Sequence, residues 1–327
     1  MRSTPSRRGL LLLPPTLLAV PAVARAQASY PDRPIRLIVP FPPGGPVDAG
    51  ARILAGALPD HLRQAVVVEN RSGAGGVLGM DAVAKAAPDG YTLGYGSLGP
   101  VGVGASLLAN PPYDSRKDFA PVSIVGSVPS MIVVRPGLGA GTLQDLLRLA
   151  RERPGRVTYA SAGIGSTPQL AFELLKLRTG VDITHVAYRG AAPAITALIA
   201  GEVDCTSLDV MVLLPQVREG RLRALAVASR TRSPAVPEVP TTAEAGLPDV
   251  VVENWYAVLA PAGTPRDRVE RLHAAVAAAV ARPETARRFT EQGTRVIANQ
   301  PEEATAFIRA EVARWAEVVR AANIRAD

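Results

Sequence analysis

Serine and histidine are the residue types here that could supply covalent chemistry, but their spacing gives that chemistry little support. Ser97 lies in Gly96-Ser-Leu-Gly99, which misses the G-x-S-x-G nucleophile elbow because residue 95 is Tyr. Ser166 follows Gly165 but has no neighbouring base, and His185 belongs to a later expected strand. A serine hydrolase using Ser166 or Ser97 therefore stays the alternative function, and Ser166→Ala would abolish its turnover.

Metal and cofactor chemistry has no recognisable motif in the sequence. Cys205 is the single cysteine, so the chain has no intramolecular disulfide and no CxxC pair. The three histidines, His61, His185 and His273, show no HExxH spacing. Gly73-Ala-Gly75 with Gly79 is not a GxGxxG fingerprint. We expect no cofactor and no metal.

Two glycine-containing loops favour anion binding instead. Ile35–Val39 reads as a buried strand that ends at prolines, and Gly44-Gly45 then opens a helix. Residues 157–168 repeat this order of strand, Gly/Ser loop and helix start. Backbone amides at a helix N-terminus bind anions, so each loop is a candidate half of one carboxylate site. The candidate ligand-binding residues are Phe41, Gly44, Gly45, Val47, Asp48, Ser97, Ser161, Ala162, Gly165, Ser166, Thr167, Asp204 and Asp209.

The acidic candidates carry open alternatives. We interpret Asp48 as a helix-opening cap rather than a direct ligand contact. Asp204 and Asp209 would recognise a polar or cationic group, or serve as buried caps.

Repeated strand–loop–helix units predict an α/β fold with parallel, doubly wound sheets. The apolar segments 122–125 and 131–134 are expected to flank an interruption at Gly126–Pro129 where the chain crosses between domains. The C-terminal part is too small to stand alone. We therefore expect lobe 1 at residues 27–126 plus 252–327 and lobe 2 at residues 127–251, with a hinge near 126 and 252.

Two capping boxes are expected within these lobes. They are Thr142 with Asp145, and Thr264 with Asp267, each at the start of a helix.

The first 26 residues have the pattern of a signal peptide. Arg2, Arg7 and Arg8 precede a short apolar run, and Ala24-Arg25-Ala26 is an A-x-A cleavage site. The arginine pair leaves Sec and twin-arginine export both open. Without this segment the chain keeps 32 basic and 29 acidic residues, a net charge of +3. No dense basic stripe remains, so we expect an exported, periplasmic protein that binds no nucleic acid.

The sequence resembles the Bug family, the TctC-like substrate-binding receptors of tripartite tricarboxylate transporters. The resemblance runs along essentially the whole mature chain and rests on these segments: Tyr30 to Gly45, Val66-Val-Val-Glu-Asn-Arg-x-Gly-Ala-Gly-Gly76, Ala87-Pro-Asp-Gly-Tyr-Thr-Leu93, Tyr113 to Val122, Tyr159 to Gly163, Tyr188-Arg-Gly-x-Ala-Pro193, Gly220 to Ala226 and Val239 to Gly246. It implies a two-lobed, periplasmic-binding-protein-like (type II, Venus flytrap) fold with a ligand cleft between the lobes. It further implies a carboxylate held by main-chain amides and bridging waters between loops 41–48 and 161–167.

Three departures from the family pattern concern the ligand. The usual Gly-Gly-[Gly/Ser]-[Ser/Thr]-Asp appears as Gly44-Gly-Pro-Val-Asp48, which loses an amide donor at Pro46 and a hydroxyl at Val47. Gln169 stands where the family commonly has His, and the Phe-Asp-Asn segment reads Ser207-Leu-Asp209. These changes favour a less polar, aliphatic or aromatic monocarboxylate.

The sequence therefore predicts a solute-binding receptor rather than an enzyme. We expect a monomer that closes its lobes on a small organic carboxylate and delivers it to membrane transporter subunits or a sensor.

Overall fold

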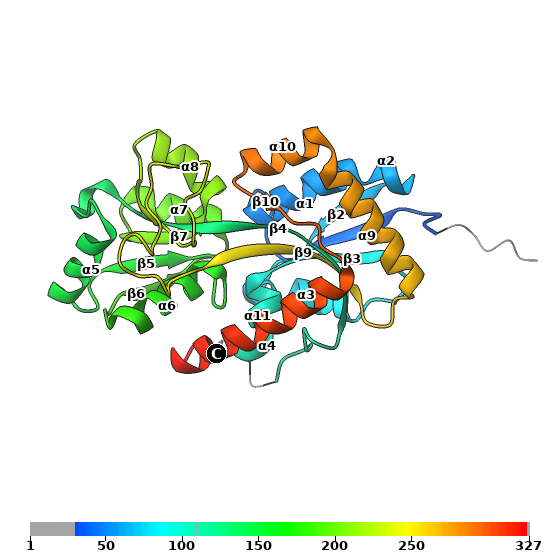
Figure 1. Cartoon of the computed structure of the whole chain (residues 1–327). Helices are drawn as coiled ribbons and strands as arrows, with labels where there is room; N and C mark the ends of the chain where they lie inside the picture. The colour runs from blue at the N-terminus through cyan, green and yellow to red at the C-terminus, as the bar shows by residue number, and fades with distance from the viewer. Residues whose placement is uncertain (1–29, 109, 326–327) are drawn as a thin grey trace, which may run out of the picture.

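The computed structural model describes residues 30–108 and 110–325, so the expected signal peptide lies outside the described residues. Figure 1 shows two α/β lobes side by side, joined by the long strands β4 and β9. One lobe is built from the blue, cyan and orange-to-red segments, and the other from the green and yellow ones. None of the helices in the described residues has the length and apolar character that crossing a membrane requires.

Lobe 1 begins with three strand–helix units, as the repeated pattern predicts. Its first part contains, in chain order, β1 (Ile35–Val39), α1 (Pro46–Ala57), α2 (Pro59–Leu62), β2 (Val66–Asn70), η1 (Ala74–Gly76), α3 (Val77–Ala84), β3 (Thr92–Ser97), the π-helical turn η2 (Leu98–Val103) and α4 (Gly104–Leu107). β1 lies between β2 and β3 and is parallel to both. Every apolar side chain of β1 is buried, as expected for a strand covered on both faces.

Lobe 2 repeats this design. It contains η3 (Pro136–Leu138), α5 (Leu143–Glu152), β5 (Thr158–Ser161), α6 (Thr167–Thr179), β6 (Thr184–Ala187), α7 (Ala191–Ala200), β7 (Cys205–Asp209), α8 (Val210–Arg218) and β8 (Arg223–Val227). β5 lies between β6 and β7 and is parallel to both. Both lobes therefore present the carboxyl ends of parallel strands, which is where α/β proteins bind ligands.

The chain returns to lobe 1 through β9. The remaining elements are β9 (Glu253–Pro261), α9 (Arg266–Ala281), α10 (Pro283–Glu291), β10 (Arg295–Val296) and α11 (Pro301–Ala321). The full strand order is β2-β1-β3-β9-β4-β7-β5-β6, with β8 and β10 also paired to β4. Because β9 is antiparallel to both β3 and β4, the sheet is mixed rather than purely parallel.

Strand β4 (Phe119–Val134) carries the chain from lobe 1 to lobe 2 without the interruption that the sequence led us to expect. It pairs with β9 as far as Pro129 and with β7 and β8 from Ser130 onward. Gly126 does not break the strand. A Cβ there would lie 2.7 Å from the Arg295 carbonyl, so glycine is needed for the close approach of β10.

One of the two expected capping boxes is confirmed. Thr142 caps α5 by accepting from the Asp145 amide, and Asp145 reaches back to the Thr142 amide. The prediction of a capping box at Thr264 and Asp267 is wrong. The Thr264 hydroxyl donates to the Pro261 carbonyl, and α9 begins at Arg266 with Pro265, not Thr264, as its N-cap.

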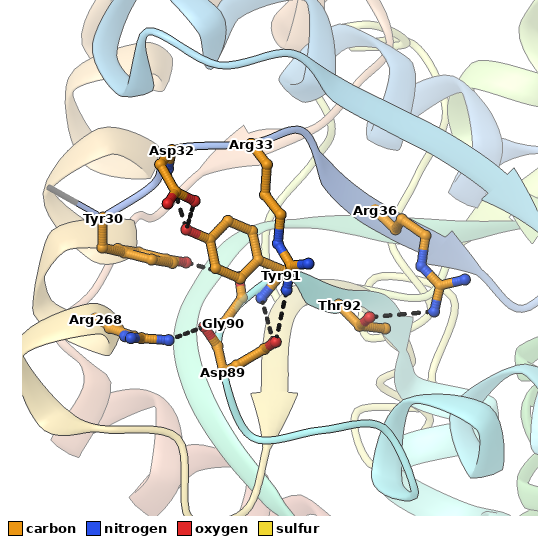
Figure 2. A network of polar contacts seen from close by, with 9 residues as sticks. All are labelled: Tyr30, Asp32, Arg33, Arg36, Asp89, Gly90, Tyr91, Thr92 and Arg268. Atoms are coloured by element: carbon orange, nitrogen blue, oxygen red, sulfur yellow. Dashed lines mark hydrogen bonds and ion pairs between the residues drawn. The ribbon is translucent and has the colours of Figure 1, made fainter. Parts of the chain in front are cut away.

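The first described residues are fixed to lobe 1 by a polar network (Figure 2). The Tyr30 hydroxyl donates to the Gly90 carbonyl at 2.6 Å, and the Arg268 guanidinium lies over the Tyr30 ring. The Tyr91 hydroxyl donates to Asp32 Oδ1 at 2.6 Å. The chain that follows the expected cleavage site is thereby held to the turn before β3 and to α9.

Candidate functional site

A cavity lies between the lobes, at the carboxyl ends of their parallel strands. The space between its walls, together with the open solvent at its mouth, amounts to about 600 Å³. Lobe 1 contributes the β1–α1 loop and Ser97 at the end of β3. Lobe 2 contributes the β5–α6 loop, the β6–α7 loop and the end of β7, and Asn254 comes from β9.

Three helices begin at this cavity. The N-caps of α1, α6 and α7 are Gly45, Ser166 and Gly190, and none of them makes a side-chain capping hydrogen bond. The first-turn amides of a helix have no partner within the helix, so they are available to a ligand. Their positive dipole ends, one from lobe 1 and two from lobe 2, together favour a negative charge.

A proline removes one amide from the first turn of each of these helices. Pro46 is the first residue of α1, Pro168 the second of α6 and Pro193 the third of α7. The donors that remain are the amides of Val47, Asp48, Thr167, Gln169, Ala191 and Ala192.

The cavity walls are mostly apolar. The apolar residues that line it are Phe41, Pro42, Pro43, Pro46, Val47, Ala162, Pro168, Ala191, Ala192, Pro193 and Leu208. The arrangement suits a ligand that pairs an anionic end with an apolar body.

A buried polar network forms one side of the cavity and joins the lobes. Asn254 Nδ2 donates to Asp209, at 3.1 Å from Oδ2 and 3.3 Å from Oδ1. Asn254 Oδ1 accepts from the Leu98 amide at 3.4 Å and from Thr167 Oγ1 at 3.3 Å. One side chain on the connecting strand β9 therefore contacts both lobes.

Asp209 is the carboxyl group in this network. It is 3% exposed, and the Tyr256 hydroxyl also donates to its Oδ2. Burial raises the pKa of Asp209 to about 6, although the hydrogen bonds from Tyr256 and Asn254 act in the opposite direction.

Eight of the residues expected to bind ligand line this cavity: Phe41, Gly45, Val47, Ser97, Ala162, Ser166, Thr167 and Asp209. They come from four separate loops or strand ends, and the two loops identified as anion sites do face the same space. Direct contact with a ligand stays a prediction for each of them.

Two expected backbone donors are used within their own loops. The Gly44 amide donates to Asp48 Oδ2 at 3.0 Å, and Asp48 is also held by Arg52 and Asn70, so it fixes the start of α1. The Gly165 amide donates to Gln169 Oε1 at 2.6 Å. Gly44, Asp48 and Gly165 are not among the residues that line the cavity.

Ser161 and Asp204 also lie outside the cavity lining. Ser161 is fully buried, with its Oγ 2.6 Å from His185 Nε2. Asp204 precedes β7, at the end of the strand opposite Asp209, and pairs with Arg135 at 2.8 Å. Because four residues of β7 separate the two aspartates, Asp209 reaches the end of the strand that borders the cavity and Asp204 does not.

The sequence reasoning did not assign the start of the third helix, α7, or the side chain of Asn254 from β9 to the site. Arg189 and Gly190 precede α7 and line the cavity, and their strand–glycine–helix pattern is the signal that identified the other two loops. Asn254 had no comparable signal, because an antiparallel strand from a distant part of the sequence brings it to the site.

The serine hydrolase alternative lacks an assembled pair. Ser166 Oγ donates to the Gly163 carbonyl at 2.6 Å, whereas His185 contacts Ser161. Within residues 30–108 and 110–325, neither Ser97 nor Ser166 is hydrogen-bonded to a histidine, and no cluster of three potential metal ligands occurs.

Comparison with known proteins shows the family. The family model described as "Tripartite tricarboxylate transporter family receptor" (TctC) matches residues 50–324. The chain is 44% identical over 293 residues to the protein BugT of Bordetella pertussis, covering 89% of this chain and 90% of BugT.

Two solved structures from Rhodopseudomonas palustris are similar along nearly their whole length. Rpa4515 with adipate is 36% identical, with a TM-score of 0.86 over 90% of this chain and 99% of that one. MatC with bound malate is 35% identical, with a TM-score of 0.84 over 89% of this chain and 100% of that one.

Proposed function

The chain belongs to the tripartite tricarboxylate transporter receptor family, and from that premise we propose that its interlobe cavity captures a small organic carboxylate. The observation that carries the proposal is the meeting of three helix N-termini from two lobes at one cavity. Relatives solved with adipate and with malate support a carboxylate as the ligand class.

The ligand we propose has an apolar body. Pro46 and Val47 offer no hydroxyl to the ligand, and Pro46 offers no amide. Prolines, alanines, Phe41 and Leu208 surround the remaining space. An aliphatic or aromatic monocarboxylate would bury its hydrocarbon part against these walls, at roughly 25 cal/mol for each Å² removed from water.

The receptor would work outside the cytoplasm and without a chemical step. Residues 1–26 would direct export and be cleaved near Ala26. A monomer would then carry its ligand to membrane transporter subunits or to a sensor, as the family description suggests.

A thermal-shift screen tests the ligand class. We expect hexanoate and benzoate to raise the melting temperature more than adipate, malate, citrate or glutamate, because bound ligand stabilises the folded state by mass action. Stabilisation by citrate or glutamate alone would contradict the apolar class. A shift with none of the six acids, together with denatured protein that releases no acid detectable by mass spectrometry, would contradict carboxylate capture itself.

Ala191→Pro tests the role of the helix amides directly. Proline is tolerated as the first residue of a helix and removes only the N–H. We expect roughly tenfold weaker binding of the best acid, because one charge-assisted hydrogen bond is lost. Ala191→Gly is the matched control, since it removes the methyl group and keeps the amide. Equal affinities for the two variants would show that this amide does not contact the ligand.

A further inference from the structure

We propose that Asp209 takes up one proton from solvent when the cavity captures its carboxylate, so that the receptor binds an anion and a proton together. This inference rests on the proposed function and adds a second bound species to it. The proton goes to a carboxylate oxygen of Asp209, so the entry of a singly charged ligand leaves the net charge of the cavity unchanged.

The first argument is the position of Asp209. It ends strand β7, lines the cavity and is 3% exposed. Its hydrogen-bond donors are the Asn254 amide and the Tyr256 hydroxyl, and both are neutral. Asp209 is also the N-cap of α8, but its side chain makes no capping hydrogen bond to that helix. Within the described residues, the buried carboxylate therefore has hydrogen-bond donors but no cationic partner.

Among the described residues, the strands packed around Asp209 place no cation against it. Ser130, on the neighbouring strand β4, is the register partner of Asp209. Tyr95, on β3, stacks on Tyr256. On β9, Glu253 alternates to the opposite face and lies 3.7 Å from Arg295.

Arg189 also lines the cavity but is exposed to solvent. Within the described part of the chain, its guanidinium makes no ion pair and no hydrogen bond to Asp209. Burial accordingly raises the pKa of Asp209 to about 6.

The second argument is the charge of the ligand. A carboxylate held by the amides of α1, α6 and α7 shares one cavity with Asp209, and two neighbouring carboxylates in a poorly solvated site raise the pKa of one of them. Near neutral pH, capture of the anion therefore shifts Asp209 from mostly ionised to mostly protonated. The protonated group gains an O–H donor that it can offer to the ligand.

A zwitterionic ligand, with an ammonium group against an ionised Asp209, is the competing arrangement. An ammonium group brings three donors, but the helix amides and Arg189 that line the cavity are also donors. Asn254 Oδ1 already accepts from the Leu98 amide and Thr167. Asp209 is the single carboxylate among the described residues that line the cavity, so one acidic group would have to serve an ammonium group among many donors, which favours the proton.

Calorimetry with benzoate and hexanoate as probes tests the inference. Titrations at about pH 7.5 in two buffers of different ionisation enthalpy give the number of protons taken up. We expect nearly one proton per bound acid, and a Kd that weakens roughly tenfold per pH unit between about pH 6 and pH 8. In Asp209→Asn, whose amide mimics the protonated carboxyl, we expect no uptake and a Kd independent of pH.

Asp204→Asn is the matched control, because it removes a carboxylate from the other end of the same strand, outside the cavity. It should keep the proton uptake of the wild type. If Asp209→Asn does not fold, the proton count of the wild type still decides the question.

The possible failures are distinguishable. Binding of either probe without proton uptake overturns the inference and leaves the proposed function intact. Tighter binding of phenylalanine than of benzoate, without uptake, also overturns it and assigns Asp209 to an ammonium group. At about pH 5.5 Asp209 is already mostly protonated, so binding requires little proton uptake. If no acid bound even there, the proposed function itself would be contradicted.

Discussion

At the scale of single residues, surroundings rather than residue type decide what the two neighbouring aspartates do. Asp204 pairs with Arg135 at 2.8 Å and accepts from the Thr158 amide at 3.0 Å. Asp209 lies at the other end of the same strand, and the described side chains that donate to it are neutral. Asp204 therefore holds neighbouring segments of the chain together, whereas the ionised form of Asp209 is disfavoured by burial at the cavity.

This difference predicts how stability depends on pH. The pKa of Asp209 is about 6 in the folded protein against an ordinary value of 3.8, so the folded state binds the proton more tightly. The resulting stabilisation is present below about pH 4 and is lost as the pH rises through about 6. Asp209→Asn should therefore be more stable than the wild type by up to about 3 kcal/mol at about pH 8, and by little at about pH 4. Urea unfolding across that range measures the difference, and a gap that does not change with pH would contradict the prediction.

At the scale of elements, the helices differ in how their first turns are satisfied. α5 begins far from the cavity and closes its first turn with Thr142 and Asp145. The helices α1, α6 and α7 begin at the cavity with Gly45, Ser166 and Gly190, and no side chain caps them. The amides that capping would have satisfied are thus left for a ligand.

Thr142→Ala should lower the free energy of unfolding by about 1 kcal/mol, because α5 loses its capping side chain. Thr142→Ser should restore most of this stability, since serine keeps the hydroxyl. Both variants should bind ligand as the wild type does, because α5 contributes no cavity residue. Chemical unfolding measures the stability of both variants, and calorimetry measures their Kd. If Thr142→Ser lost as much stability as Thr142→Ala, or if either variant had an altered Kd, the prediction would be wrong.

At the scale of the whole molecule, the two lobes approach each other at glycines beside the cavity. A Cβ on Gly99 of lobe 1 would lie 2.9 Å from the Gly165 carbonyl of lobe 2, and a Cβ on Gly75 would collide with the Ile164 carbonyl. Helix α11 crosses from lobe 1 to pack against α6, and its apolar residues share a core with Leu170 and Leu174. The lobes are therefore in direct backbone contact beside the cavity, and β4 and β9 connect them.

Gly99→Ala should hold the lobes apart by a few tenths of an ångström and weaken ligand binding several-fold. The matched control is Gly56→Ala on the exposed side of α1, where a Cβ meets nothing within 4 Å. That control should gain roughly 0.5–1 kcal/mol of stability and keep its affinity. Calorimetric Kd values that are equal in the two variants would show that closure does not require this contact.

The sequence by itself determined the local units of this protein. The apolar run of β1, the glycines at 44 and 45 and the repeated order around Gly165 indicated parallel strands and assigned two of the three helix starts to the site, because these signals depend on neighbouring residues. The family resemblance added the two-lobed architecture.

Tertiary structure decided the rest. It determined which amides remain free, since Asp48 and Gln169 occupy those of Gly44 and Gly165. It also placed Asn254 against Asp209 across 45 residues of sequence, and it separated Asp209 from Asp204. The physical reason is that burial, charge compensation and hydrogen-bond satisfaction depend on residues distant in the chain, which no local pattern of residue types records.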